Sequence, residues 1–135
     1  IKDNYIAEIV NVSINNNISA IILTNTTEGN RNNLVNKMNK EEGGLSGEPL
    51  QKISTSIIKK FYKELNGKIP IIGVGGVNSG KAAYEKILAG ASLLQLYTSF
   101  VYRGPSTAKK IKKELIEILK AEGINNIQEV VGKNI

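Results

Sequence analysis

The sequence predicts an α/β fold, more specifically part of a (β/α)8 TIM barrel, from three observations. Short apolar segments alternate with segments of helical periodicity, as in parallel sheets with helical crossovers. One apolar segment, residues 69–77, carries no charge and suits a strand covered on both faces. Only three strands are visible, and alone they would leave sheet edges unpaired. We therefore expect about the last three βα units of a barrel of about 250 residues.

The first half of the chain predicts a helix, a strand and a long polar segment. Apolar residues between 3 and 16 fall on one helical face, and Asp3 is the expected N-cap. These apolar residues are Ile6, Ile9, Val10 and Ile14. Residues 18–23 follow as a buried strand. The polar segment from there to Glu48 is too long for a plain connection, so we expect it to be functional or mobile.

The second half repeats the alternation of helices and strands. The expected elements are helices at 54–65 and 79–89, strands at 69–77 and 92–97, a last long helix ending near Gly123, and a short amphipathic tail at 127–131. Asn66 and Gly67 supply the stop signal of the first of these helices. We expect residues 1–135 to be the C-terminal part of a single domain. The first residue is not Met, so we also expect a longer protein.

Composition limits the chemistry available to this chain. Its 135 residues are 41% hydrophobic and 22% charged, and they include neither cysteine nor histidine. Disulfides and thiolate metal sites are therefore excluded, and the usual general base and commonest metal ligand are missing. We expect no metal site, and chemistry that relies on amides, hydroxyls, carboxylates, lysine or a bound cofactor.

The segment around Gly75 and Gly76 has the pattern of a phosphate site. Adjacent glycines follow the strand at 69–77, where they allow backbone to approach a ligand closely. The helix that begins next offers free N–H groups to an anion. In barrels the loops after strands seven and eight bind phosphate, and here these would be Gly75–Gly76 and Tyr97–Thr98.

Two nucleotide-binding patterns are incomplete in this segment. Residues 75–82 match the spacing of a P-loop, but Ala82 stands where a hydroxyl would hold Mg²⁺. A dinucleotide fingerprint would need a third glycine at position 78, which is Asn78. We expect neither type of nucleotide site.

Two polar or glycine-rich segments are further candidates for ligand binding. Asn25 and the hydroxyls beside it follow a strand, and an amide can grip a pyrimidine ring edge. A capped turn explains the same residues equally well. The glycines of residues 43–47 permit close approach to a planar ligand, and a flexible loop tip is the alternative.

The net charge of +6 comes largely from the last long helix, at Lys109, Lys110, Lys112, Lys113 and Lys120. A nucleic-acid patch and a solvated outer face are both consistent with this pattern. We favour the solvated face, because no aromatic residue or arginine interleaves the lysines, and we expect no nucleic-acid partner. A weakly basic surface near anionic lipid stays open.

Taken together, these residues resemble the dihydroorotate dehydrogenases, specifically their membrane-associated, quinone-dependent class. The matching pieces occur in the family's order: TNTT at 24–27, GGLSG at 43–47, ELNGKIPIIGVGGV at 64–77, AGASLLQLYT at 89–98 and GP at 104–105. The short segment between TNTT and GGLSG and the QLYT ending favour the quinone-dependent class over the soluble one.

The resemblance implies an FMN-bearing barrel that oxidises dihydroorotate to orotate in pyrimidine biosynthesis and passes the electrons to a quinone. It implies that Asn25 and Thr26 hold the substrate ring. The implied FMN contacts are Thr24 and Gly47, with Gly76, Tyr97 and Thr98 at the phosphate and Ser46 and Gly75 as weaker candidates.

In that family the catalytic serine base and the parts that meet quinone and membrane lie upstream of residue 1. We therefore expect no catalytic residue in this segment, and quinone contact and peripheral membrane association through the missing N-terminal region. These 135 residues alone should be inactive. The resemblance implies a location at the cytoplasmic side of a bacterial membrane or at the inner mitochondrial membrane.

Two alternatives come from other classes of protein. One is another FMN- or phosphate-binding barrel oxidoreductase, such as an α-hydroxy-acid oxidase. It would share the GVGG and GAS elements but lack the TNTT and GGLSG pair. The other is a non-enzymatic binding module that uses the basic last helix, and it predicts salt-dependent nucleic-acid affinity.

Overall fold

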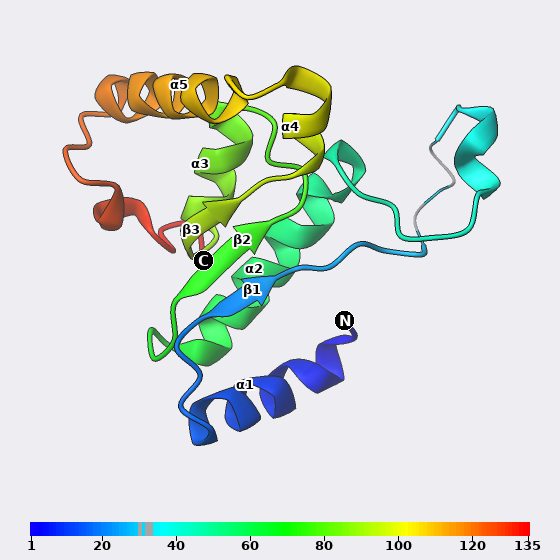
Figure 1. Cartoon of the computed structure of the whole chain (residues 1–135). Coiled ribbons are helices and arrows are strands. Elements are labelled where there is room, and N and C mark those ends of the chain that lie inside the picture. The colour runs from blue at the N-terminus through cyan, green and yellow to red at the C-terminus, as the bar shows by residue number, and fades with distance from the viewer. Residues whose placement is uncertain (30, 32–33) are drawn as a thin grey trace.

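The computed structural model describes residues 1–29, 31 and 34–135, and three parallel strands form its centre (Figure 1). The strands are β1 (Ile21–Leu23), β2 (Ile71–Val74) and β3 (Ala91–Gln95), in the order β1-β2-β3. β1 and β2 pair from Ile21 opposite Ile71, and β2 and β3 pair up to Val74 opposite Gln95. The predicted parallel arrangement is confirmed.

All three strands differ in length from the prediction, for local reasons. The backbone N–H of Ile18 bonds to Ser13 O at 3.0 Å and Asn17 has a φ of +53°, so residue 18 closes the preceding helix rather than starting β1. β2 ends at Val74 because Gly75 and Gly76 leave the extended region. β3 likewise stops at Gln95, before the turn into the next helix.

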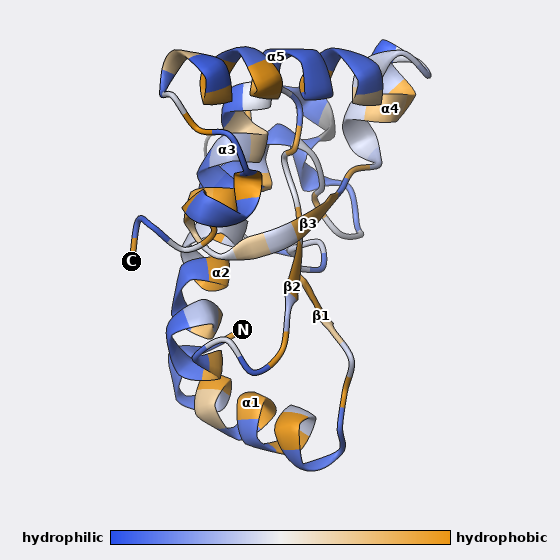
Figure 2. Cartoon of the chain, turned by 90° about the vertical axis from the view of Figure 1, so that its left-hand side faces the viewer, coloured by the Kyte–Doolittle hydropathy of each residue, from blue (hydrophilic) through white to orange (hydrophobic). Residues whose placement is uncertain are grey.

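Helices cover one face of the sheet, as the edge view in Figure 2 shows for α2 (Gln51–Leu65) and α3 (Gly80–Leu88). On this face Ile58 and Phe61 of α2 are fully buried against the strands. On the other face Ile22 and Leu93 are 55% and 63% exposed. The sequence predicted a strand at 69–77 that is covered on both faces. Within the described residues, only the face that carries the helices is covered.

The N-terminal helix α1 (Ile6–Asn15) packs on α2, but its predicted cap is wrong. Asp3 lies inside a 3-10 turn, Asp3–Tyr5, and Tyr5 occupies the N-cap position of α1. The Asp3 carboxylate pairs instead with Lys60 Nζ on α2, at 2.7 Å. The Asp3 carboxylate therefore binds the ammonium group of Lys60 and does not cap the first turn of α1.

The polar segment before α2 has more structure than its composition suggested. An antiparallel bridge joins Thr27 to Leu45, and Lys37–Lys40 forms a 3-10 turn. The Arg31 guanidinium donates to the carbonyls of Asn39, Glu41 and Gly43, which gathers the segment around one side chain. The expectation of a mobile segment also covers residues 30, 32 and 33, which lie outside the described residues.

Three further elements complete the chain. A six-residue helix that the sequence did not predict, α4 (Thr98–Arg103), follows β3 directly, and the last long helix is α5 (Thr107–Ala121). A 3-10 turn, Ile127–Val130, ends the fold at the predicted amphipathic tail and buries Val130 against α3. Within the described part of the chain, every helix is too short or too polar to span a bilayer.

Candidate functional site

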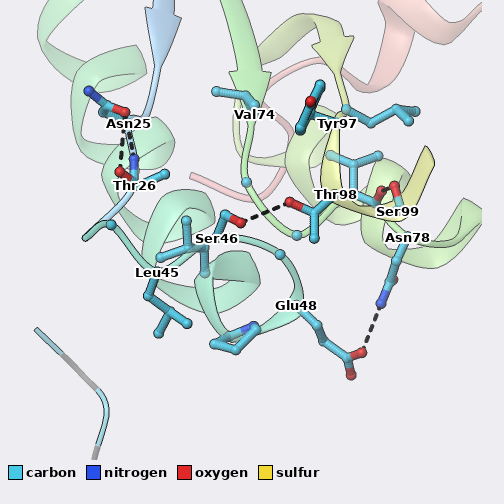
Figure 3. A pocket seen from close by; sticks show the side chains of 18 of the residues that line it. Asn25, Thr26, Leu45, Ser46, Glu48, Val74, Asn78, Tyr97, Thr98 and Ser99 are labelled. Atoms are coloured by element: carbon cyan, nitrogen blue, oxygen red, sulfur yellow. Dashed lines mark hydrogen bonds between the residues drawn. The ribbon is translucent and has the colours of Figure 1, made fainter. Parts of the chain in front are cut away.

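A cleft of about 760 Å³ opens at the carboxyl end of the sheet (Figure 3). The segments that follow β1, β2 and β3 all contribute to its lining. Every site residue that the sequence predicted lies in this lining: Thr24, Asn25, Thr26, Ser46, Gly47, Gly75, Gly76, Tyr97 and Thr98. The cleft has the size typical of cofactor and substrate pockets.

The turn after β1 uses one end of the Asn25 side chain. Asn25 Oδ1 accepts a hydrogen bond from the backbone N–H of Thr26 at 2.8 Å. Among the described residues, Asn25 Nδ2 donates to no acceptor. The two interpretations of this residue therefore fit together, because the oxygen caps the turn and the amide N–H groups stay available to a ligand.

The glycine-rich segment packs directly against the turn that follows β1. Thr27 and Leu45 exchange backbone hydrogen bonds of 3.2 and 2.7 Å. A Cβ at Gly44 would overlap the side chain of Thr26, so glycine is required for this approach. These contacts place residues 43–47 beside the Asn25 turn as one wall of the cleft, rather than as a free loop tip.

The same segment reaches across the cleft to the start of α4. Thr98 Oγ1 donates to Ser46 Oγ at 3.0 Å, a bond drawn in Figure 3. The next residue, Gly47, has a φ of +84°, and a Cβ there would lie 3.0 Å from Thr98 Cγ2. Gly47 therefore allows the backbone before α2 to lie against Thr98.

The turn after β2 and the start of α4 together offer backbone donors for an anion. The expectation of free N–H groups at the start of α3 is wrong, because Gly80 N–H donates to Glu114 Oε2 at 2.6 Å and Ala82 N–H donates to Ser79 Oγ at 3.2 Å. Gly75 and Gly76 have φ values of +100° and +71°, which glycine adopts readily. In the described part of the chain, no protein acceptor takes a hydrogen bond from the N–H groups of Gly75, Gly76, Thr98 or Ser99. Free N–H groups suit a phosphate dianion, so the residues present fit the phosphate of a flavin mononucleotide.

Polar side chains at the rim join the segment after β2 to the segment before α2 and to α4. Asn78 Nδ2 donates to Glu48 Oε2 at 3.1 Å, and an Arg103 guanidinium N–H donates to Asn78 O at 2.6 Å. Ser99 Oγ donates to Val77 O at 2.6 Å. The bonds of Arg103 and Ser99 anchor both ends of α4 to the segment after β2, which explains how a short helix is held at the cleft.

A buried lysine lies behind the glycine turn, the turn at Gly75 and Gly76 after β2, and the sequence did not predict it. Lys86 of α3 is 0% exposed and donates to hydroxyls at the start of α2. Its position carried a usable signal, because it follows Ala82 by four residues and Ala83 by three and so shares their buried helical face.

Known proteins resemble this chain in sequence. A family model described as "Dihydroorotate dehydrogenase" matches residues 1–119. A dihydroorotate dehydrogenase (quinone) of Nostoc punctiforme is 44% identical over 96% of this chain and 36% of its own length. The mitochondrial dihydroorotate dehydrogenase (quinone) of Mus musculus is 45% identical over 93% and 32%.

Solved structures extend the likeness to three dimensions. The chain superposes on DHODH of Eimeria tenella in complex with ferulenol with a TM-score of 0.93, at 40% identity, over 98% of this chain and 35% of that one. For the ligand-free form the TM-score is 0.95, at 40% identity, over 99% and 37%. The predicted fold class is confirmed: the three βα units are part of a (β/α)8 barrel. The chain spans about a third of the length of the relatives it matches.

Proposed function

The chain belongs to the dihydroorotate dehydrogenase family, and from this premise we propose that it is the cofactor-binding C-terminal part of a quinone-linked dihydroorotate dehydrogenase. The complete protein would oxidise dihydroorotate to orotate in pyrimidine biosynthesis. The observation that carries the proposal is that one cleft collects substrate and FMN candidates from segments that follow three neighbouring strands.

FMN, when bound, would supply the redox chemistry by accepting hydride from the substrate and passing the electrons on to a quinone. The chain's part is binding and orientation. The N–H groups of Gly75, Gly76 and Thr98 would hold the phosphate, because no other acceptor in the described residues uses them. The hydroxyl pair of Ser46 and Thr98 would fix the loop against the cofactor.

The substrate ring would lie beside the turn after β1. Asn25 Nδ2 can donate to a ring carbonyl, while Thr26 Oγ1 can donate or accept at a ring edge. Because Asn25 Oδ1 is committed to the N–H of Thr26, the amide orientation is fixed before substrate arrives. The proton at C5 would be removed by a serine outside this chain.

The proposal assigns quinone contact and membrane attachment to parts of the protein other than these residues. The complete protein would be a peripheral membrane enzyme, at the cytoplasmic side of a bacterial membrane or at the inner mitochondrial membrane. Residues 1–135 alone would bind neither quinone nor membrane and would not turn over substrate.

The test uses the complete protein and its visible spectrum. We expect a yellow protein with about one FMN per chain, whose flavin absorbance bleaches anaerobically with dihydroorotate and returns with a short-chain quinone. A 2-hydroxy acid such as lactate serves as the control substrate. A colourless protein, or a flavin that lactate bleaches and dihydroorotate does not, would overturn the proposal.

A further inference from the structure

A fully buried lysine lies directly behind the glycine turn, outside the cleft itself. Lys86 Nζ donates to Ser54 Oγ, to Thr55 Oγ1 at 3.1 Å and to Gln51 O at 3.4 Å. All three acceptors belong to the first five residues of α2. The ammonium group of α3 therefore holds the start of the helix that packs under the turn after β2.

Donor and acceptor chemistry fixes what the serine in this cluster can do. An ammonium group only donates, so Ser54 Oγ must accept from Lys86 and use its own hydrogen elsewhere. The acceptors within reach are Gly75 O at 3.1 Å and Gln51 O at 3.3 Å. Lys86 thus directs the Ser54 hydroxyl towards the Gly75 carbonyl, the nearer of the two.

The Gly75 carbonyl belongs to the same peptide plane as the N–H of Gly76. In a trans peptide these two groups point in opposite directions, so fixing the carbonyl also fixes the N–H. The turn is tight on the same side, because a Cβ at Gly76 would lie 2.7 Å from the backbone N of Gln51. Hydrogen bonding and packing by α2 together aim the Gly76 N–H away from the helix.

The charge of Lys86 has no close counter-ion within the described residues, where the one ion pair joins Lys60 to Asp3. The adjacent carboxylate of Glu85 accepts a hydrogen bond from Gln51 Nε2 at 2.9 Å instead. Burial lowers the pKa of Lys86 to about 8, and Glu85 opposes this shift. A buried cation without a paired carboxylate is costly, so its retention behind an anion site suggests a role there.

We propose that Lys86 is a positioning residue for the flavin phosphate, acting through Ser54 on the Gly75–Gly76 peptide and adding a buried positive charge behind it. The inference rests on the proposed function, because it needs FMN in the cleft. It predicts an effect confined to the phosphate. Riboflavin has the same ring system without the phosphate and should not report the change.

The test compares the affinities of FMN and riboflavin for the flavin-free complete protein, by fluorescence titration. Lys86→Met should raise the Kd for FMN about tenfold or more, equivalent to about 1.4 kcal/mol, with less than about a twofold change for riboflavin. Ser54→Ala should act in the same direction. Lys81→Met is the matched control, since Lys81 lies on the same helix with an exposed side chain.

Each outcome decides one point. An unchanged Kd for FMN, or an equal rise for both flavins, would overturn the role of Lys86. If Lys86→Met does not fold, Ser54→Ala decides the point by the same ratio of Kd values. A wild-type protein that binds dihydroorotate but neither flavin would overturn the proposed function itself, which separates that failure from failure of the Lys86 role.

Discussion

Thr98 and Ser46 share a hydrogen bond of 3.0 Å although they are 52 positions apart in the chain. Thr98 begins α4 after β3, while Ser46 belongs to the segment that connects β1 to α2. These two strands lie on either side of β2, so the bond closes a loop over the end of the central strand. Both residues line the same cleft as Gly75 and Gly76.

Removing this hydroxyl should weaken cofactor binding. Thr98→Val deletes the bond to Ser46, while it keeps the backbone N–H and the methyl group that lies against Gly47. A hydrogen bond contributes about 1 kcal/mol, so the Kd for FMN should rise about fivefold. Thr98→Ser keeps the hydroxyl and serves as the control. Equal Kd values for the two variants would contradict the prediction.

Substitution of Asn25 should reduce turnover rather than flavin content. Asn25→Ala removes a hydrogen bond to substrate worth about 1–3 kcal/mol, so kcat/KM for dihydroorotate should fall about tenfold or more. Asn25→Asp keeps the oxygen that accepts from Thr26 N but has no amide N–H. Its thermal stability should match the wild type while its kcat/KM stays low. Full activity in either variant would refute the substrate role.

Alanine at Gly76 should destabilise the protein and empty its flavin site. The residue has a φ of +71°, and a Cβ would lie 2.7 Å from the backbone of Gln51. Gly67 is a matched control, since its φ is +76° and a Cβ there meets nothing within 4 Å. Gly67→Ala should cost about 1–2 kcal/mol in free energy of unfolding, from backbone strain alone. Gly76→Ala should cost more and lower the FMN content; equal losses would contradict this prediction.

The position of the site could be predicted from sequence because parallel topology is readable. Apolar segments at 18–23, 69–77 and 92–97 alternate with helices, and the carboxyl ends of parallel strands meet at one edge. Residues that follow those strands were therefore expected to lie close together at that edge of the sheet. The roles of the individual residues came from the family resemblance, since an Asn at a turn has a purely local explanation as well.

The elements that the sequence did not reveal depend on tertiary contacts. α4 is rich in aromatic and β-branched residues, which favour helices weakly, and Ser99 and Arg103 tie it to carbonyls after β2. Lys86 is hidden for a related reason. Lysine is normally exposed, and its burial depends on acceptors that α2 brings from more than 30 residues away.

Stability should respond to alkaline pH in two opposite ways through residues of α3. Burial lowers the pKa of Lys86 to about 8, against 10.5 for an ordinary lysine. Between these values the unfolded state binds more protons than the folded state, so the free energy of unfolding should rise from pH 8 upwards. Burial, with the hydrogen bond to Glu122, raises the pKa of Tyr84 from 10.0 to about 12. There the folded state binds more protons, so stability should fall from pH 10 to 12.

Urea unfolding of the flavin-free complete protein between pH 7 and 11 can separate the two groups. The difference in unfolding free energy between wild type and Lys86→Met should change from pH 8 upwards in favour of the wild type, because only the wild type loses a buried charge. Tyr84→Phe is the control, and its difference from wild type should stay flat until about pH 10. A flat difference for Lys86→Met across this range would mean that the ammonium group keeps its ordinary pKa, held by its three acceptors on α2.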